Sequence, residues 1–219
     1  MAYVTPGTVA AGDVATAAAW NVITNDILQF APFVQGVFTT EAVRDAAITS
    51  PTEGMHAYLT AATVPAATGE STGVPTGVQT IYNGSVWVCV TDVSAFQSTT
   101  GTKAASSSVP GALTGGGTNS TVTLVTGTTA FVSYSAESTG TIQARRGLGV
   151  AVSGATTRSS LVPLKMLHFP ANAGTQTFLT ATVIVTGLTA GTNVFTLEYA
   201  NEDGTATFGN RFLSARGIA

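Results

Sequence analysis

Ionic side chains are scarce in this chain of 219 residues: only 9% are charged, and the formal net charge is −3. Average soluble proteins carry about 25% charged residues. The lack of a basic excess removes the electrostatic case for nucleic-acid binding. A monomer normally keeps a more charged surface for solubility. The composition therefore favours a protein covered largely by copies of itself or by partners, with an uncharged threonine-rich exterior as the alternative.

Residues that commonly carry catalysis or bind metals are also few. Cys89 is the only cysteine, so no intrachain disulfide is available, and its Val-Trp-Val-Cys-Val context predicts a small buried hydrophobe. His56 and His168 each lie in a strand-like run, which favours structural roles. No His/Cys cluster suits zinc, and no G-x-S-x-G, H-E-x-x-H, C-x-x-C or P-loop motif occurs. We therefore predict no enzyme activity, no catalytic residue, no cofactor and no metal.

The clustered charges have ordinary structural explanations. Glu198, Glu202 and Asp203 bracket a turn, which favours a solvated tip over a weak calcium site. The pair Arg145-Arg146 is expected on a solvent-facing loop. Pairing with carboxylates of a neighbouring subunit, or contact with an anionic surface, is the alternative for these two arginines.

Long apolar runs are missing as well. No run approaches the roughly 20 residues that span a bilayer. The first positive side chain is Arg44, so no basic segment of a signal peptide precedes it. We expect neither membrane insertion nor secretion.

The residues that are abundant point to β structure, most clearly in residues 120–219. Phe195, Leu197 and Tyr199 alternate with more polar residues, which is the period of a strand with one core face. Asp203-Gly204 follows and predicts a hairpin. Six to eight short strands of this kind predict a mainly β fold with a C-terminal antiparallel β-sandwich, similar to a jelly roll.

The first 35 residues are expected to form an extended arm and a helix. Asp13 is a plausible N-cap for a helix from Val14 to Phe30, which Pro32 ends. An apolar stripe runs along this helix at 3-4-3-4 spacing. Its members are Trp20, Ile23, Ile27, Phe30 and Val34. The stripe is either the core-facing side of the helix or a short self-associating or docking seam.

The middle of the chain divides into two expected parts. Residues 36–93 resemble a small α+β docking module, with a helix at Glu41–Ala47, a strand at Met55–Leu59 and a hairpin of type I′ around Asn83-Gly84. Residues 94–119 are rich in Gly, Ser and Thr and have the composition of a flexible linker. Such a tract becomes ordered only when neighbours hold it.

Together these pieces resemble virion structural proteins of tailed bacteriophages, especially those that infect actinobacteria. The stretches that carry the resemblance are residues 12–21 with 25–28, residues 44–55 with 81–87, and residues 193–199 with 204–211. The first is similar to the N-terminal helix of tail appendages, and the second to a small module of such proteins. The third is similar to the final hairpin of phage jelly rolls shaped like C1q and tumour-necrosis-factor domains.

The resemblance implies a non-enzymatic component of a phage particle, made in the bacterial cytoplasm. A homotrimeric tail appendage or minor tail protein would attach through its N-terminal part and display the sandwich to the host surface. The alternatives are a head fibre or capsid decoration protein, and a module that binds cell-surface carbohydrate through exposed aromatics such as Tyr134 and Phe208. A polysaccharide-degrading enzyme is the least favoured, because converging carboxylates are missing.

Overall fold

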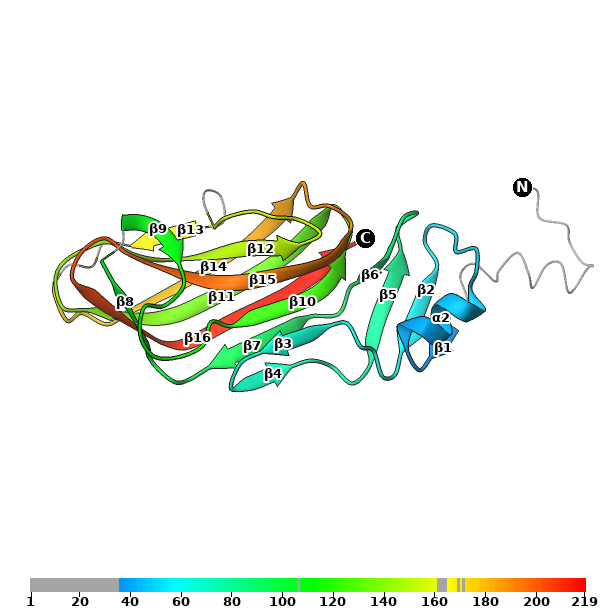
Figure 1. Cartoon of the computed structure of the whole chain (residues 1–219), viewed down its shortest axis with the longest axis horizontal. Coiled ribbons are helices and arrows are strands. Elements are labelled where there is room, and N and C mark those ends of the chain that lie inside the picture. The colour runs from blue at the N-terminus through cyan, green and yellow to red at the C-terminus, as the bar shows by residue number, and fades with distance from the viewer. Residues whose placement is uncertain (1–35, 106, 161–164, 169, 171) are drawn as a thin grey trace, which may run out of the picture.

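The computed structural model describes residues 36–105, 107–160, 165–168, 170 and 172–219. Two packed sheets form a β-sandwich, and a smaller sheet with one helix lies at one end of it (Figure 1). The C-terminus lies where the two parts meet. The predicted mainly β fold with an antiparallel sandwich is confirmed.

The smaller part is a four-stranded sheet in the order β1-β2-β5-β6 with helix α2. Its elements are β1 (Gly36–Phe38), α2 (Glu41–Ala47), β2 (His56–Leu59), β5 (Val78–Tyr82) and β6 (Trp87–Cys89). The hydroxyl of Thr40 accepts from the backbone N–H of Val43 at 3.4 Å and so caps the helix. The expected helix, strand and β5–β6 hairpin are therefore confirmed.

The predicted turn type in that hairpin was wrong. A type I′ turn needs positive φ at both central residues. Gly84 has φ of 87°, but Asn83 is not among the positive-φ residues. Instead, Asn83 Oδ1 accepts from the backbone N–H groups of Ser85 and Val86 at 3.1 and 3.0 Å. The asparagine thus holds a longer loop through its side chain.

The two stretches that resemble a small phage module, residues 44–55 and 81–87, contact one another. Arg44 of α2 is 5% exposed, and its guanidinium lies 4.6 Å from the centroid of a Trp87 ring. It also donates to Thr80 Oγ1 at 3.4 Å and pairs with Asp45 at 2.8 Å. The cation–π contact with Trp87 and the hydrogen bond to Thr80 therefore fasten the helix to the sheet, while the ion pair with Asp45 lies within the helix.

The sandwich consists of two six-stranded sheets. One has the order β13-β12-β15-β10-β3, with β9 also paired to β15; the other has the order β14-β11-β16-β7-β4, with β8 also paired to β16. We call the second the β14 sheet. The first contains β3 (Ala66–Thr68), β9 (Ser107–Gly111), β10 (Thr121–Thr126), β12 (Arg146–Gly154), β13 (Lys165–His168) and β15 (Gly191–Asn201). The second contains β4 (Ser71–Gly73), β7 (Val93–Gln97), β8 (Gly101–Ala104), β11 (Thr129–Gly140), β14 (Thr177–Thr186) and β16 (Thr205–Ile218).

Alternation along the strands builds the core between these sheets. Every second residue of β11 is buried, and β10 and β15 follow the same pattern over most of their length. The largest fully buried apolar side chains include Tyr134, Tyr199, Phe195 and Phe208. The rings of Tyr199 and Phe208 pack with centroids 5.0 Å apart. The aromatics proposed for sugar contact, Tyr134 and Phe208, are thus core residues.

Two sequence-based expectations about connections were wrong. The tract 94–119 is not a free linker, because β8 and β9 and most of β7 fall within it and pair with β15 or β16. Asn201–Gly204 does not close a hairpin either: β15 and β16 belong to different sheets. The turn instead carries the chain across the core from one layer to the other.

The predicted N-terminal helix lies outside the described residues. So do all five members of its apolar stripe, namely Trp20, Ile23, Ile27, Phe30 and Val34. Their role as a docking or oligomer interface remains a prediction.

Candidate interaction surface

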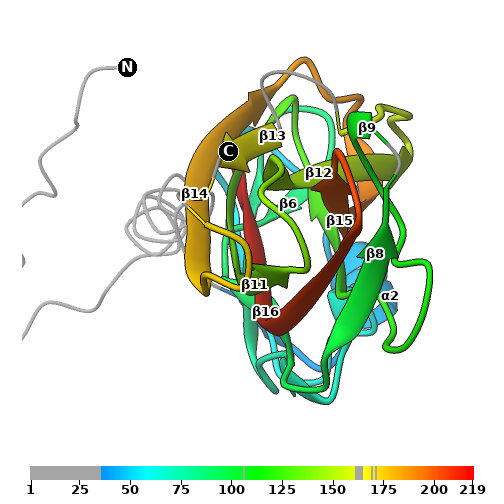
Figure 2. The ribbon, with the colours of Figure 1, turned by 90° about the vertical axis from the view of Figure 1, so that its left-hand side faces the viewer.

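Strand β14 is an edge of its sheet. Within the described chain it pairs along its length only with β11, from Thr129↔Thr186 to Ser138↔Thr177. Figure 2 shows it at the outer margin of the sandwich. Ten residues of strand span roughly 33 Å. One side of β14 therefore presents a long row of backbone N–H and C=O groups that no described strand pairs with.

The composition of β14 does little to protect this edge. The strand is Thr-Phe-Leu-Thr-Ala-Thr-Val-Ile-Val-Thr, without charge, proline or glycine. Phe178 and Ile184 point away from the core and are 61% and 58% exposed. Ala181 and Val183, on the core side, are only partly buried. Both faces of the strand therefore carry apolar side chains and are partly open, and we call this strand with its free side the β14 edge.

One charged residue covers one end of the β14 edge. Arg158 donates from Nη1 to the carbonyl of Thr186 at 3.0 Å and from Nη2 to that of Gly187 at 3.3 Å. Native sheets usually blunt a long edge with charges, bulges or proline to prevent pairing with another chain. Arg158 reaches only this end of β14, and the strand itself has no charge, proline or glycine, so most of the edge has no such protection.

A second feature lies on the outer face of the same sheet, across β7, β11 and β16. It is a shallow depression of about 440 Å³, which we call the serine depression. It is lined by Asp92, Ser94, Phe131, Ser133, Phe212, Ser214 and Arg216. Arg216 lies over the Phe131 ring, 5.2 Å from its centroid, and pairs with Asp92 at 3.8 Å.

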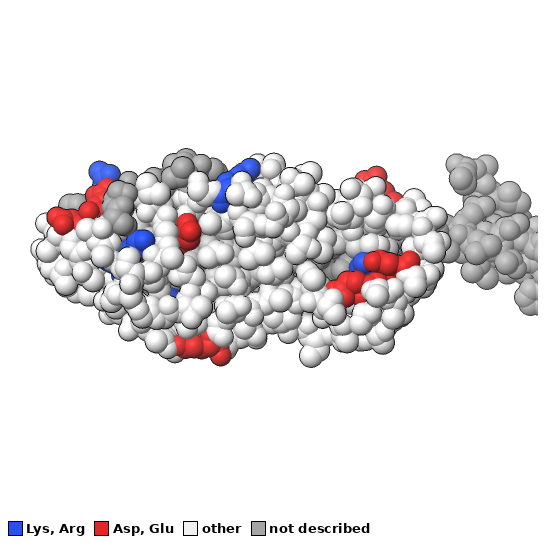
Figure 3. Space-filling model, in the orientation of Figure 1, with Lys and Arg blue, Asp and Glu red and all other residues white. Residues whose placement is uncertain are grey.

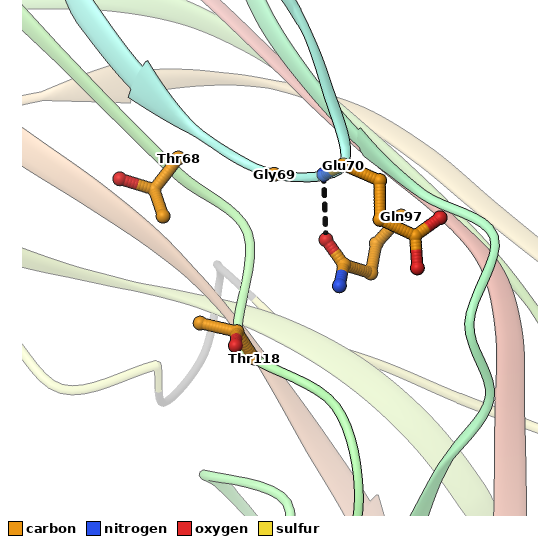
Figure 4. Close-up of a pocket in the computed structure, with 5 residues that line it drawn as sticks. All are labelled: Thr68, Gly69, Glu70, Gln97 and Thr118. Atoms are coloured by element: carbon orange, nitrogen blue, oxygen red, sulfur yellow. Dashed lines mark hydrogen bonds between the residues drawn. The ribbon is translucent and has the colours of Figure 1, made fainter.

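A smaller polar pocket of about 130 Å³ lies at the turn between β3 and β4, lined by Thr68, Gly69, Glu70, Gln97 and Thr118 (Figure 4). Gln97 Oε1 accepts the Glu70 backbone N–H at 2.9 Å. The Glu70 carboxylate accepts from the backbone N–H and hydroxyl groups of Ser98 and Thr99. The Ser98 side chain is the main cause that lowers the Glu70 pKa. Glu70 thus acts as a clamp between strands.

Charge is sparse on the surface shown in Figure 3, where isolated acidic and basic groups are separated by wide uncharged areas. Arg145 is exposed and pairs with Glu202 at 3.4 Å, as expected for a solvent-facing turn. The same expectation was wrong for Arg146, which is 1% exposed and donates to the Thr175 carbonyl at 3.2 Å. Burial lowers the Arg146 pKa.

The remaining sequence-predicted groups do not converge. His56 and His168 lie on β2 and β13, in different sheets. Among the described residues no three His, Cys, Asp or Glu side chains are grouped so that they could hold a metal. The same residues include no helix long and apolar enough to cross a membrane. The β14 edge and the serine depression could not be predicted from the sequence, since both depend on which strands lie side by side.

No model of a known protein family matches the chain, and no curated protein matches it. Among solved structures, it is similar to the enzymatically active domain of tailspike protein 4 of bacteriophage CBA120, at 9% identity and a TM-score of 0.27. That match covers 68% of this chain and 19% of the other. It is also similar to the isomalto-dextranase of Arthrobacter globiformis T6 complexed with panose, at 16% identity and a TM-score of 0.30. That match covers 90% of this chain and 42% of the other.

The chain thus spans less than half the length of either structure. Both likenesses are weak.

Proposed function

We propose that this protein is a non-enzymatic structural component of a tailed-bacteriophage particle that assembles with copies of itself through the β14 edge. The observation that carries the proposal is this ten-residue, uncharged edge strand with Phe178 and Ile184 exposed. An edge of this kind is a template for strand pairing or for burial against another subunit. The sequence resemblance to phage virion proteins supports the place of the protein in a particle.

A homotrimer is the assembly that the resemblance implies. Its N-terminal part would attach to the particle and its sandwich would face the host surface. Contacts that are weak in one subunit become strong when a symmetric assembly presents several at once. The strand order also supports a jelly roll like that of C1q. Eight of the twelve sandwich strands form two four-stranded antiparallel groups, β13-β12-β15-β10 and β14-β11-β16-β7, and the chain passes repeatedly between them.

Light scattering coupled to size exclusion tests the assembly. Three chains of 22.0 kDa would give a mass of about 66 kDa. Ile184→Lys places a charge on the exposed face of β14, near its C-terminal end, and should shift the mass toward 22.0 kDa. Ile142→Lys is the matched control, because Ile142 is also exposed, at 37%, but lies outside β14. A wild-type chain that stays monomeric at all concentrations would refute the assembly.

The place in the particle needs a separate experiment. A tail appendage and a head fibre or decoration protein would share the same fold and the same self-association. Antibody labelling of intact particles distinguishes them by position, and a chain that never appears in particles contradicts both.

A further inference from the structure

The serine depression combines apolar rings with a row of hydroxyl groups. Ser133 is paired with Ser214, and Ser214 with Ser94, so three serines lie side by side on β11, β16 and β7. Side chains at directly paired positions are about 4.5–5.5 Å apart. The neighbours on the same strands, Val132 and Leu213, are fully buried, so the serines face outward.

The two phenylalanines lie on opposite sides of this row. Phe131 precedes Ser133 by two residues on β11, and Phe212 precedes Ser214 by two residues on β16. Because β11 and β16 are antiparallel, these offsets point in opposite directions. Phe131 lies two residues to one side of the serine row and Phe212 two residues to the other. The two rings are therefore about 13 Å apart along the strand direction. The depression therefore has an apolar ring at each end and hydroxyl groups between them.

Charge at the depression is balanced. Asp92 and Arg216 pair with one another at 3.8 Å, both are exposed, and they are the only charged residues that line it. Serine hydroxyls both donate and accept hydrogen bonds, the guanidinium donates and the carboxylate accepts. A volume of about 440 Å³ lies within the range of small-ligand sites. A ligand that fits has apolar faces, many hydroxyl groups and no net charge.

We infer that the serine depression binds a neutral oligosaccharide. The apolar C–H faces of its sugar rings would lie against Phe131 and Phe212, and its hydroxyl groups would bond to the serine row and to the Asp92–Arg216 pair. This inference rests on the proposed function, in which the sandwich faces the host surface, and it names the class of molecule that is contacted there. The depression lies directly beside β14 on the same sheet face, because Phe131 is paired with Ile184 and Ser133 with Thr182.

The test uses the full chain, screened on a glycan array and then titrated with cellotriose, maltotriose and chitotriose at millimolar concentration by saturation-transfer NMR and calorimetry. At least one neutral glycan should bind. A variant that combines Phe131→Ala with Phe212→Ala should bind the glycan at least about tenfold more weakly. Each aromatic contact of this kind contributes a factor on the order of ten to the affinity. Tyr58→Ala is the matched control, since Tyr58 is an exposed aromatic residue on β2, outside both the depression and the β14 edge. It should leave the affinity unchanged.

Several results would overturn the inference. They are the absence of binding to any neutral glycan, binding that the double variant leaves intact, and binding only to charged glycans that weakens with salt. A double variant that changes the mass of the assembly without any glycan effect would assign the depression to subunit contact instead. Light scattering on the same samples separates the two proposals: a monomer that binds glycan refutes self-association through the β14 edge but supports the glycan site.

Discussion

Asn193 joins three separate chain segments inside the sandwich, and replacing it should be among the more damaging single changes. Its side chain is fully buried. Nδ2 donates to Thr126 Oγ1 at 2.8 Å, to the Thr189 carbonyl at 3.0 Å and to the Gly191 carbonyl at 3.3 Å. Oδ1 accepts from the Thr156 backbone N–H at 2.9 Å. One amide therefore connects the ends of β10 and β15 with the loop after β12, beside the end of β14.

The structure sets the magnitude of the effect. Asn193→Ala removes four hydrogen bonds and leaves buried backbone groups without this partner. A typical hydrogen bond contributes about 1 kcal/mol net, and a buried group left unpaired costs about 1–3 kcal/mol. With partial relaxation we expect a loss of about 2–4 kcal/mol in the free energy of unfolding. In a chain of this size that corresponds to a decrease of roughly 5–15 °C in Tm.

Asn193→Asp gives a sharper variant of the same experiment. The carboxylate still accepts from the Thr156 N–H. It places an oxygen, in place of the NH2 group, against the carbonyls of Thr189 and Gly191. Burial would raise the folded-state pKa of this carboxyl above its unfolded value of about 3.9. The destabilisation should therefore be small near pH 4 and grow as the pH rises through the folded pKa.

Thermal and urea unfolding at one fixed protein concentration measures both variants, since self-association would make Tm depend on concentration. Thr128→Ala, at an exposed position in the turn between β10 and β11, is a control for mutation on the surface. An Asn193→Ala variant within about 0.5 kcal/mol of wild type would refute the assigned network, because that is the range of ordinary surface substitutions.

Two further predictions concern single titratable groups. The Glu70 pKa is lowered, first by the Ser98 hydroxyl, from a reference value of 4.5, so its contribution to stability should be present above that value and lost as the pH falls through the folded pKa. Glu70→Gln should therefore be less stable than wild type at pH 7, and acid unfolding curves should show this difference shrinking as the pH falls through the folded pKa of Glu70; a constant difference would contradict the clamp. Burial raises the pKa of the Cys89 thiol to about 11, so Ellman's reagent at pH 8 should modify the chain only after denaturation. Rapid labelling of the folded protein would contradict this burial.

Local patterns predicted the elements whose structure is decided by neighbouring residues. Alternation at Phe195, Leu197 and Tyr199 identified a strand with one buried face, and all three side chains are fully buried. The helix at Glu41–Ala47 was predicted with the bounds it has. Cys89 is buried as its apolar neighbours indicated.

These local patterns could not predict which strands pair with one another over long distances in the sequence. Ser71–Gly73 and Gly101–Ala104 are short, polar and glycine-containing, and they become strands because β7 and β16 are available to pair with them. The turn at Asp203-Gly204 allows both a hairpin and a passage between layers. Both outcomes use the same positive φ, which is 62° at Gly204. Its residues alone do not tell which sheet the next strand joins.

The β14 edge could not be predicted from the sequence for a similar reason. β14 has apolar residues on both faces, a pattern that usually indicates a strand covered on both sides. Within the strand, Leu179 and Val185 are buried, whereas Phe178 and Ile184 are exposed. Only the sheet order, with β14 at the end, distinguishes a covered strand from an open one.

The distribution of charge strengthens the case for a covered exterior beyond what composition implied. The chain has eight Lys and Arg residues, and Arg44, Lys103, Arg146 and Arg211 are all buried. No Asp or Glu among the described residues is buried. Half of the positive charge therefore lies inside, and the accessible surface is poorer in cations than the sequence suggests. Solubility of the free chain then depends on a modest negative charge and on threonine and serine, which offer little protection to an uncharged strand edge. Pairing or covering of β14 by another copy is the arrangement that removes this liability.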